Sequence, residues 1–146
     1  MRATQQLKYA LYGVFDLAYN GQDAPVPLQV IGERQGIPTR YLEQIFQRLR
    51  RAGLVRSKRG PGGGYLLASP AHEISIADVV VAVQGALLSM ARSEADGGAA
   101  TPGFVWERID ESLRQALGAC TIADLCREAE ERGVERASEH SLMYEI

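Results

Sequence analysis

A run of cations followed by glycines is the part of this sequence best suited to bind a ligand. Six basic side chains fall between positions 48 and 59, and residues 60–64 then hold four glycines and one proline. Clustered cations can neutralise a polyanion. Glycines let the backbone turn sharply and approach another molecule closely. Placed directly after an amphipathic segment, this pattern indicates a DNA-binding wing.

The segment before the cations predicts the element that positions them. Residues 39–52 are predicted to form a helix whose core stripe is Leu42, Ile45, Phe46 and Leu49. Its opposite face carries Arg40, Gln44, Gln47 and Arg51. A shorter helix is expected over residues 27–35, with a sharp break at 36–38. A short helix, a tight turn and a second helix with a polar face make a helix-turn-helix, whose second helix fits a major groove about 12 Å wide.

Further elements follow from periodicity and capping patterns. A helix is expected over residues 4–19, and two short strands over 54–68 flank the glycine loop. Ser75 and Asp78 resemble a capping box that opens another helix, and Thr121 caps one reaching about residue 132. Residues 89–103 read as a loop, and a short docked segment is expected at 142–144.

Between that loop and the last helix lies a seam of apolar residues at steps of three, four and three. Its members are Trp106, Ile109, Leu113 and Ala116. This spacing is typical of a coiled coil two heptads long. An isolated helix of this length is marginal, so the seam needs a partner from the chain itself or from a second copy.

Charge is divided unevenly between the two halves of the chain. Residues 1–70 contain ten Arg and Lys against four Asp and Glu, whereas residues 71–146 contain six against fourteen. The whole chain of 146 residues has a net charge of −2. A basic half that touches nucleic acid and an acidic half that does not is the simplest interpretation, and chance asymmetry is the alternative.

Composition excludes several classes of protein. No apolar run approaches the roughly 18 residues that span a membrane, and the N-terminus has no secretory core, so a cytoplasmic protein without a membrane partner is expected. No nucleophile elbow or His-Glu-x-x-His motif is present, so an enzyme is not expected. The glycine run also lacks the third glycine or the Gly-Lys-Ser/Thr of the nucleotide-phosphate loops.

Four segments together resemble the Rrf2 family of bacterial winged-helix transcriptional regulators. They read LKYAL at 7–11, YLEQI at 41–45, RAGLV at 51–55 and RGPGGGY at 59–65. The resemblance is close over residues 1–88 and weaker beyond. It implies a mainly α fold with a small β-hairpin wing: a winged helix-turn-helix domain over 1–70, then a long dimerisation helix and an effector region within 71–146.

The resemblance also implies a homodimer that binds double-stranded DNA at a pseudo-palindromic operator, most often as a repressor. By matching position, residues of the second helix lie where the family contacts bases and phosphates, and Arg59 lies where it probes the minor groove. The expected DNA-binding set is Thr39, Arg40, Tyr41, Glu43, Gln44, Arg51, Lys58, Arg59, Gly60, Gly62 and Gly63. The expected dimer interface is the seam of Trp106, Ile109, Leu113 and Ala116.

Residue chemistry suggests roles within this set. Gln44 can pair with adenine and Arg40 with guanine through two hydrogen bonds each, while Tyr41 better suits a phosphate. Glu43 can accept from a cytosine amine, or it can pair with Gln47 or Arg50 instead.

The cysteines depart from the family pattern. Cluster-binding members carry three cysteines in the loop before the dimerisation helix, and that loop has none here. Cys120 and Cys126 come later. Cys120 is expected to pack on Leu125, and Cys126 to lie in the core, both as inert thiols. No metal and no cofactor are therefore expected.

Three alternatives remain open beside this reading. One is a protein-interaction module that has lost DNA binding and uses its acidic half. The others are a thiol redox sensor and a cluster regulator with unusual ligands. The effector of a cluster-free regulator is an unknown small molecule or protein.

Overall fold

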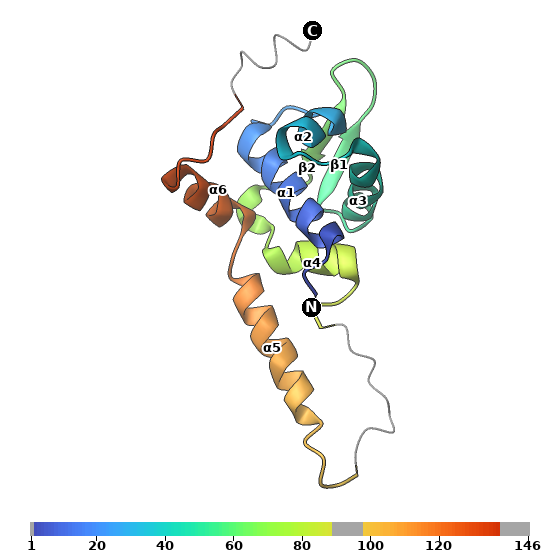
Figure 1. Ribbon diagram of the computed structural model, residues 1–146, viewed down its shortest axis with the longest axis vertical. Helices are drawn as coiled ribbons and strands as arrows, with labels where there is room; N and C mark the ends of the chain where they lie inside the picture. The colour runs from blue at the N-terminus through green and yellow to red at the C-terminus, as the bar shows by residue number, and fades with distance from the viewer. Residues whose placement is uncertain (1, 89–97, 138–146) are drawn as a thin grey trace.

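Three helices form the first part of the fold, as the sequence predicts. In the computed structural model, which describes residues 2–88 and 98–137, these are α1 (Gln5–Asn20), α2 (Leu28–Gln35) and α3 (Thr39–Arg51) (Figure 1). The hydroxyl of Thr4 caps α1 by accepting from the N–H of Leu7 at 3.2 Å. The predicted stripe of α3 is buried against α1 and α2, with Leu42, Phe46 and Leu49 fully enclosed. Burial of this stripe fixes the opposite face of α3 toward solvent.

The wing is a two-stranded antiparallel hairpin of β1 (Val55–Lys58) and β2 (Gly64–Leu67). Val55 lies opposite Leu67, and Lys58 lies opposite Gly64. Val26, just before α2, adds a short rung by exchanging two backbone hydrogen bonds of 2.9 Å with Tyr65. A Cβ atom at Gly64 would collide with the backbone of Val26. Glycine at this position therefore lets the helix-turn-helix and the hairpin come together.

Two capped helices complete the body. After a 3₁₀ turn (Ala71–Glu73) come α4 (Ile76–Gln84) and, later in the chain, α6 (Ile122–Glu131). Each begins with a full capping box, and the two helix starts are linked by backbone hydrogen bonds from Ile76 to Cys120 at 2.9 Å and from Ile122 to Ile74 at 2.8 Å. Val79, Val83 and Ile122 join the same core as α1–α3. The two helices thus pack against the unit formed by α1, α2 and α3.

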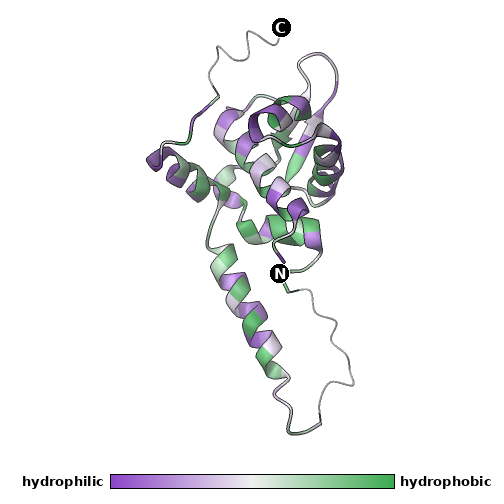
Figure 2. Ribbon diagram, in the orientation of Figure 1, coloured by the Kyte–Doolittle hydropathy of each residue, from purple (hydrophilic) through white to green (hydrophobic). Residues whose placement is uncertain are grey.

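Helix α5 (Phe104–Gly118) extends away from this body (Figure 1). Apolar and polar residues alternate along it (Figure 2). Near its free end, Phe104 is 68% exposed, Trp106 41% and Ile109 37%, while Leu117 at the other end packs against a small cluster around Val80. Within the described residues, the apolar seam of α5 is therefore left largely uncovered.

The predicted helices, hairpin and mainly α class are confirmed by the structure. The 3₁₀ turn was not predicted. The docked segment at 142–144 and the first part of the 89–103 loop fall outside the described residues, and the domain boundary at residue 70 stays a prediction. No described helix has the length and apolar character needed to cross a membrane.

Candidate nucleic-acid interface

The outward face of α3 carries the side chains that the sequence assigns to base contacts. Arg40, Tyr41, Glu43 and Gln44 are exposed, and Arg51 is exposed at the other end of the helix. Thr39, at the first turn, is half-buried. The periodicity that buries one stripe of α3 thus presents donors and acceptors along the other. Such a row is the arrangement needed to reach base edges in a major groove.

Tyr41 is held in place by its neighbours. The guanidinium of Arg40 lies 5.0 Å from the centroid of the Tyr41 ring and donates to its hydroxyl at 3.4 Å. The ring of Tyr9 on α1 lies 6.2 Å away, centroid to centroid. A groove of about 370 Å³ lies on the surface where α1 and α3 meet and is lined by Gln5, Gln6, Tyr9, Tyr41, Gln44 and Ile45. The edge of the predicted recognition surface is therefore polar and aromatic.

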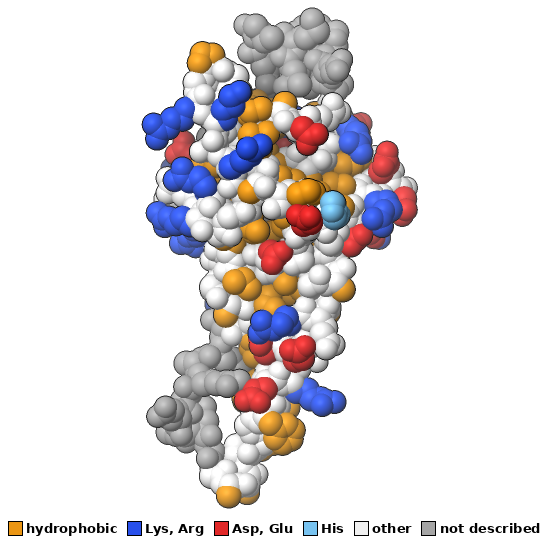
Figure 3. Space-filling model, turned by 180° about the vertical axis from the view of Figure 1, so that it is seen from behind, with side chains coloured by type: hydrophobic (Ala, Val, Ile, Leu, Met, Phe, Trp, Pro, Cys, Tyr) orange, Lys and Arg blue, Asp and Glu red, His pale blue; other side chains and the backbone are white. Residues whose placement is uncertain are grey.

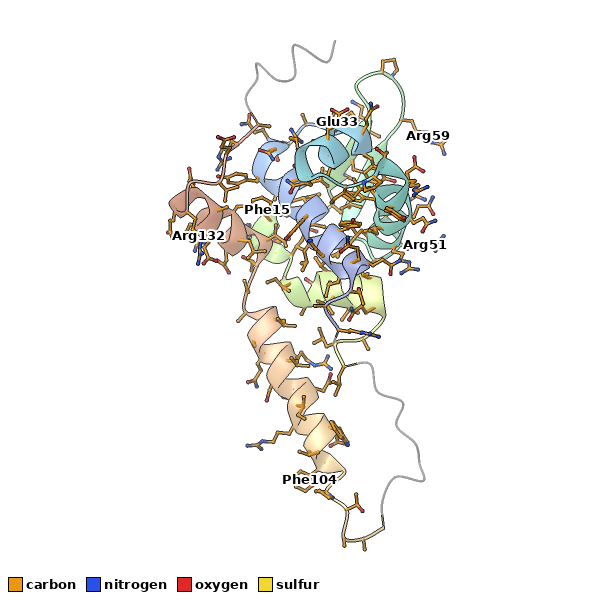
Figure 4. The ribbon with its side chains drawn as sticks, viewed as in Figure 1. Phe15, Glu33, Arg51, Arg59, Phe104 and Arg132 are labelled. Carbon is orange, nitrogen blue, oxygen red and sulfur yellow. The ribbon has the colours of Figure 1, made fainter. Side chains whose placement is uncertain are left out.

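The wing loop places its glycines and Arg59 at one end of the hairpin. Gly60 and Gly62 adopt φ angles of 89° and 72°, which side chains rarely tolerate. The N–H of Gly63 closes the turn on the carbonyl of Gly60 at 2.9 Å. Arg59 points outward to the same side of the molecule as Arg51 (Figure 4). Helix and wing therefore present cations in one direction.

Five cations of α3 and the wing have no carboxylate partner among the described residues. Across residues 2–88 and 98–137, no ion pair involves Arg50, Arg51, Arg56, Lys58 or Arg59. In the second half of the chain, by contrast, Arg114 pairs with Asp110 at 2.6 Å and Arg132 with Glu128 at 2.8 Å. Unpaired cations keep their full charge available for phosphates.

Figure 3 shows how these charges are arranged on the surface. Lys and Arg side chains gather along the edge that carries α3 and the wing, whereas basic and acidic side chains mix on the opposite edge. The charge asymmetry of the sequence is thus also an asymmetry of the folded surface. A positive edge of this kind attracts a polyanion.

Arg48 behaves differently from the other cations of its cluster. Its guanidinium donates to the side-chain oxygen of Gln6 at 3.1 Å and to the carbonyl of Val83 at 3.3 Å. Arg48 therefore connects α3 to α1 and α4. No local sequence pattern predicts these contacts. Arg50 and Arg56, conversely, belong to the unpaired set although the predicted site omitted them.

Both thiols lie in α6 or at its start, and both are held in their neutral form. Burial raises the pKa of Cys126, and Arg136 opposes that rise only in part. Burial together with the charges of Asp124 and Glu128 also raises the pKa of Cys120. A thiol with a raised pKa is a weak nucleophile at neutral pH. These surroundings support the interpretation of inert cysteines.

The side chains present do not fit a cluster held by cysteine. Iron–sulfur clusters are usually held by four thiolates, or by a mixed set with histidine, and the chain contains two cysteines. In the part of the chain that the structure describes, no group of three or more His, Cys, Asp or Glu is close enough to hold a metal ion.

A cavity of about 630 Å³ offers room for a small effector. It lies between the end of α3, α4 and α5, with Arg51, Leu54 and Val81 among its lining residues. The cavity lies between α3, the predicted recognition helix, and α5, the predicted dimer helix. A small molecule bound there would contact both helices.

Comparison with known proteins places the chain in a family. The family model Rrf2, described as an iron-dependent transcriptional regulator, matches residues 3–128. A putative HTH-type transcriptional regulator of Neisseria meningitidis serogroup A is 41% identical over 129 residues, or 86% of this chain and 87% of that protein. The HTH-type transcriptional regulator IscR of Yersinia enterocolitica is 42% identical over 129 residues, or 86% of this chain and 79% of that protein.

Solved structures agree with these sequence relatives. CymR, the global cysteine regulator of B. subtilis, superposes with a TM-score of 0.74 at 29% identity, covering 88% of this chain and 98% of that one. IscR of T. potens superposes with a TM-score of 0.73 at 34% identity, covering 99% and 96%. The chain belongs to the Rrf2 family and is a DNA-binding transcriptional regulator with a winged helix-turn-helix fold.

Proposed function

We propose that the protein binds a pseudo-palindromic operator as a homodimer and represses transcription by occluding a promoter. Helix α3 would lie in the major groove and the wing in the adjacent minor groove. The observation that carries the proposal is the set of unpaired cations on α3 and the wing, which flank an exposed row of hydrogen-bonding side chains. Such a regulator would act in the cytoplasm, beside the chromosome.

The roles of individual residues follow from their chemistry and position. Gln44, exposed near the middle of α3, suits adenine, and Arg40 suits guanine. Tyr41, fixed by Arg40 and Tyr9, suits a phosphate at the groove edge. Glu43 is exposed as well and can accept from a cytosine amine. Arg51, Lys58 and the wing glycines complete the proposed contact surface.

The proposed dimer interface is the uncovered seam of α5. Trp106 and Ile109 remain partly exposed although they are large and apolar, and Leu113 continues the same face. Exposed apolar stripes of this kind mark interaction sites. A second copy of the same helix would bury them and bring two wings to successive half-sites.

We also propose that this regulator works without an iron–sulfur cluster, although its family carries the description iron-dependent. Two thiols with raised pKa values do not supply a usual ligand set. An absorbance spectrum of protein purified without oxygen tests this directly. A colourless protein that retains operator binding is expected, and visible cluster bands in stoichiometric amount would contradict the proposal.

The experiment that tests DNA as the partner is a salt titration. Anisotropy of a labelled duplex, measured at increasing salt, should give a plot of log K against log salt with a slope of roughly −0.9 for each phosphate neutralised. With about six to eight contacts for a dimer, the expected slope is steep. Replacing Arg51 with Gln should make it shallower, whereas replacing the paired Arg132 with Gln should not. A flat response of the wild type would favour a protein-interaction module instead.

A further inference from the structure

Asp16 of α1 is a fully buried carboxylate that the DNA-binding surface does not use. It accepts three side-chain hydrogen bonds: from Arg34 at 2.6 Å, from Gln35 at 2.9 Å and from Asn20 at 3.2 Å. A buried charge is tolerated only when it is paired and hydrogen-bonded. This arrangement therefore defines one geometry for the groups around it.

Two of these donors are the last residues of α2, directly before the turn that leads to α3. Arg34 and Gln35 end the helix, and the turn then closes with a hydrogen bond of 2.9 Å from the N–H of Ile37 to the carbonyl of Gly32. Asp16 thus fixes the end of α2 against α1. Since α3 begins two residues after Ile37, its direction depends on where this end is held.

The chain after α6 reaches the same region from the other side. We call residues 134–137 the C-terminal strap. The hydroxyl of Tyr19 donates to the carbonyl of Val134 at 2.7 Å, and Arg136 donates to the carbonyl of Tyr19 at 3.0 Å. The guanidinium of Arg136 also lies 4.2 Å from the centroid of the Tyr19 ring. The strap is therefore attached to the last turn of α1 at several points.

A single amide joins the strap to the buried carboxylate. The oxygen of the Asn20 side chain accepts from the N–H of Ala137 at 2.8 Å, while its nitrogen donates to Asp16. An unbroken series of hydrogen bonds runs from the strap through Asn20 and Asp16 to the end of α2. Hydrogen bonds therefore connect Ala137 of the strap to Arg34 and Gln35 at the end of α2.

We propose that the C-terminal strap is a positioning element for operator recognition: through Asn20 and Asp16 it holds the end of α2 and so sets the direction of α3. The inference rests on the proposed function, in which α3 reads the operator. Release of the strap from Tyr19 and Asn20 loosens the end of α2 and weakens operator binding. Contacts far from the DNA thereby control affinity for it.

The test compares variants that break the connection with one that does not. Arg136→Ala removes the guanidinium contacts with Tyr19, together with an ion pair of 3.7 Å to Glu130, and leaves the hydrogen bond from Tyr19 to Val134. Asn20→Ala removes the amide that joins strap and carboxylate. Arg132→Ala is the matched control, because it deletes the same charge nearby and, among the described residues, the hydrogen bonds and the ion pair of its side chain go to Glu128. All variants are compared at a temperature where circular dichroism shows them fully folded.

Two quantities are measured on the full chain. The first is affinity for the operator duplex selected from random DNA and for an unrelated duplex. The second is the rate of amide exchange at Ile37 without DNA. For Arg136→Ala and Asn20→Ala we expect operator affinity to fall about three- to tenfold, affinity for the unrelated duplex to change little, and Ile37 to exchange faster. Arg132→Ala should match the wild type.

Wild-type operator affinity in both variants would overturn the proposal, whether or not Ile37 exchanges faster. An equal fall for both duplexes would also overturn it, because the strap would then support the fold or the charge in general. The exchange rate is independent of DNA. A wild type that prefers no sequence would therefore overturn the proposed function, while faster exchange at Ile37 in the variants would still show that the strap holds the turn.

Discussion

Arg59 stands at the start of the wing loop with no carboxylate partner among the described residues, and it points away from the body. In our account it enters a minor groove. A narrow, AT-rich minor groove concentrates negative potential and attracts an inserted arginine. Arg59→Ala should therefore weaken binding most at operators with AT-rich flanks, as measured by anisotropy on duplexes that differ only in those flanks.

Arg56→Ala is the matched control for this comparison. Arg56 lies on the stem of the same hairpin and is also exposed and without an ion-pair partner among the described residues. A cation that contacts only phosphate should weaken all duplexes alike. An equal loss for both variants on every flank would show that Arg59 does not sense groove width.

For single residues, the sequence predicted which side chains α3 exposes better than it predicted their long-range contacts. The exposed row of α3 followed from periodicity, because a helix with one apolar stripe has only one other face to offer. The orientation of Arg48 toward Val83 could not be predicted, since that contact joins residues 35 positions apart. The need for glycine at position 64 was hidden for the same reason: it depends on the approach of Val26.

Among the elements, α6 begins with a capping box whose contribution to stability can be measured. The side chain of Thr121 accepts from the N–H of Asp124 at 3.1 Å, and Asp124 accepts in return from the N–H of Thr121 at 2.9 Å. Loss of such a cap typically costs about 1 kcal/mol. Thr121→Ala should lower the free energy of unfolding by about that amount in urea denaturation. Ser75→Ala, in the equivalent box of α4, should behave alike.

The same box makes a prediction about pH. Hydrogen bonds from the backbone and side chain of Thr121, helped by Arg127, hold the pKa of Asp124 below its ordinary value. A carboxyl with a lowered pKa in the folded state stabilises the fold above its unfolded-state pKa, and this contribution is lost as pH falls through the folded-state pKa. Asp124→Asn should therefore show a weaker loss of stability on acidification than the wild type. Parallel stability–pH curves would contradict this.

Helix α5 carries the prediction about assembly. Ile109→Asp places a charge in the exposed apolar seam and should separate the dimer and reduce operator affinity by at least tenfold, because each half-site would then bind alone. Sedimentation velocity and anisotropy measure the two effects. Gln115→Asp adds the same charge to another face of the helix and should leave the dimer intact. A dimeric Ile109→Asp variant would mean that another surface makes the interface.

The elements themselves were largely predictable because each has a local signal. Both capping boxes were visible as Ser75 with Asp78 and Thr121 with Asp124, and both helices begin there. The backbone bonds that join these two starts were not foreseeable, since they link residues more than 40 positions apart. Local chemistry decides where helices begin, whereas tertiary contact decides which of them meet.

Over the whole molecule, the unpaired cations and several ion-paired ones lie in different regions. The edge formed by α3 and the wing carries unpaired cations, while α5 and α6 pair Arg114, Arg127 and Arg132 with nearby carboxylates. The uneven composition of the two halves anticipated this division. It did not reveal Asp16, a single buried acid within the basic half, which the structure connects to the C-terminal strap.

In the proposed function two copies of α3 read a symmetric operator, and selection from random duplex DNA tests this most directly. The wild type should enrich a pseudo-palindrome whose half-sites lie about 34 Å, or a multiple of it, apart. Gln44→Ala should enrich the same motif with one base pair in each half-site relaxed, a loss of about 1–3 kcal/mol of discrimination. No enrichment by the wild type, or an unchanged motif with Gln44→Ala, would contradict the claim.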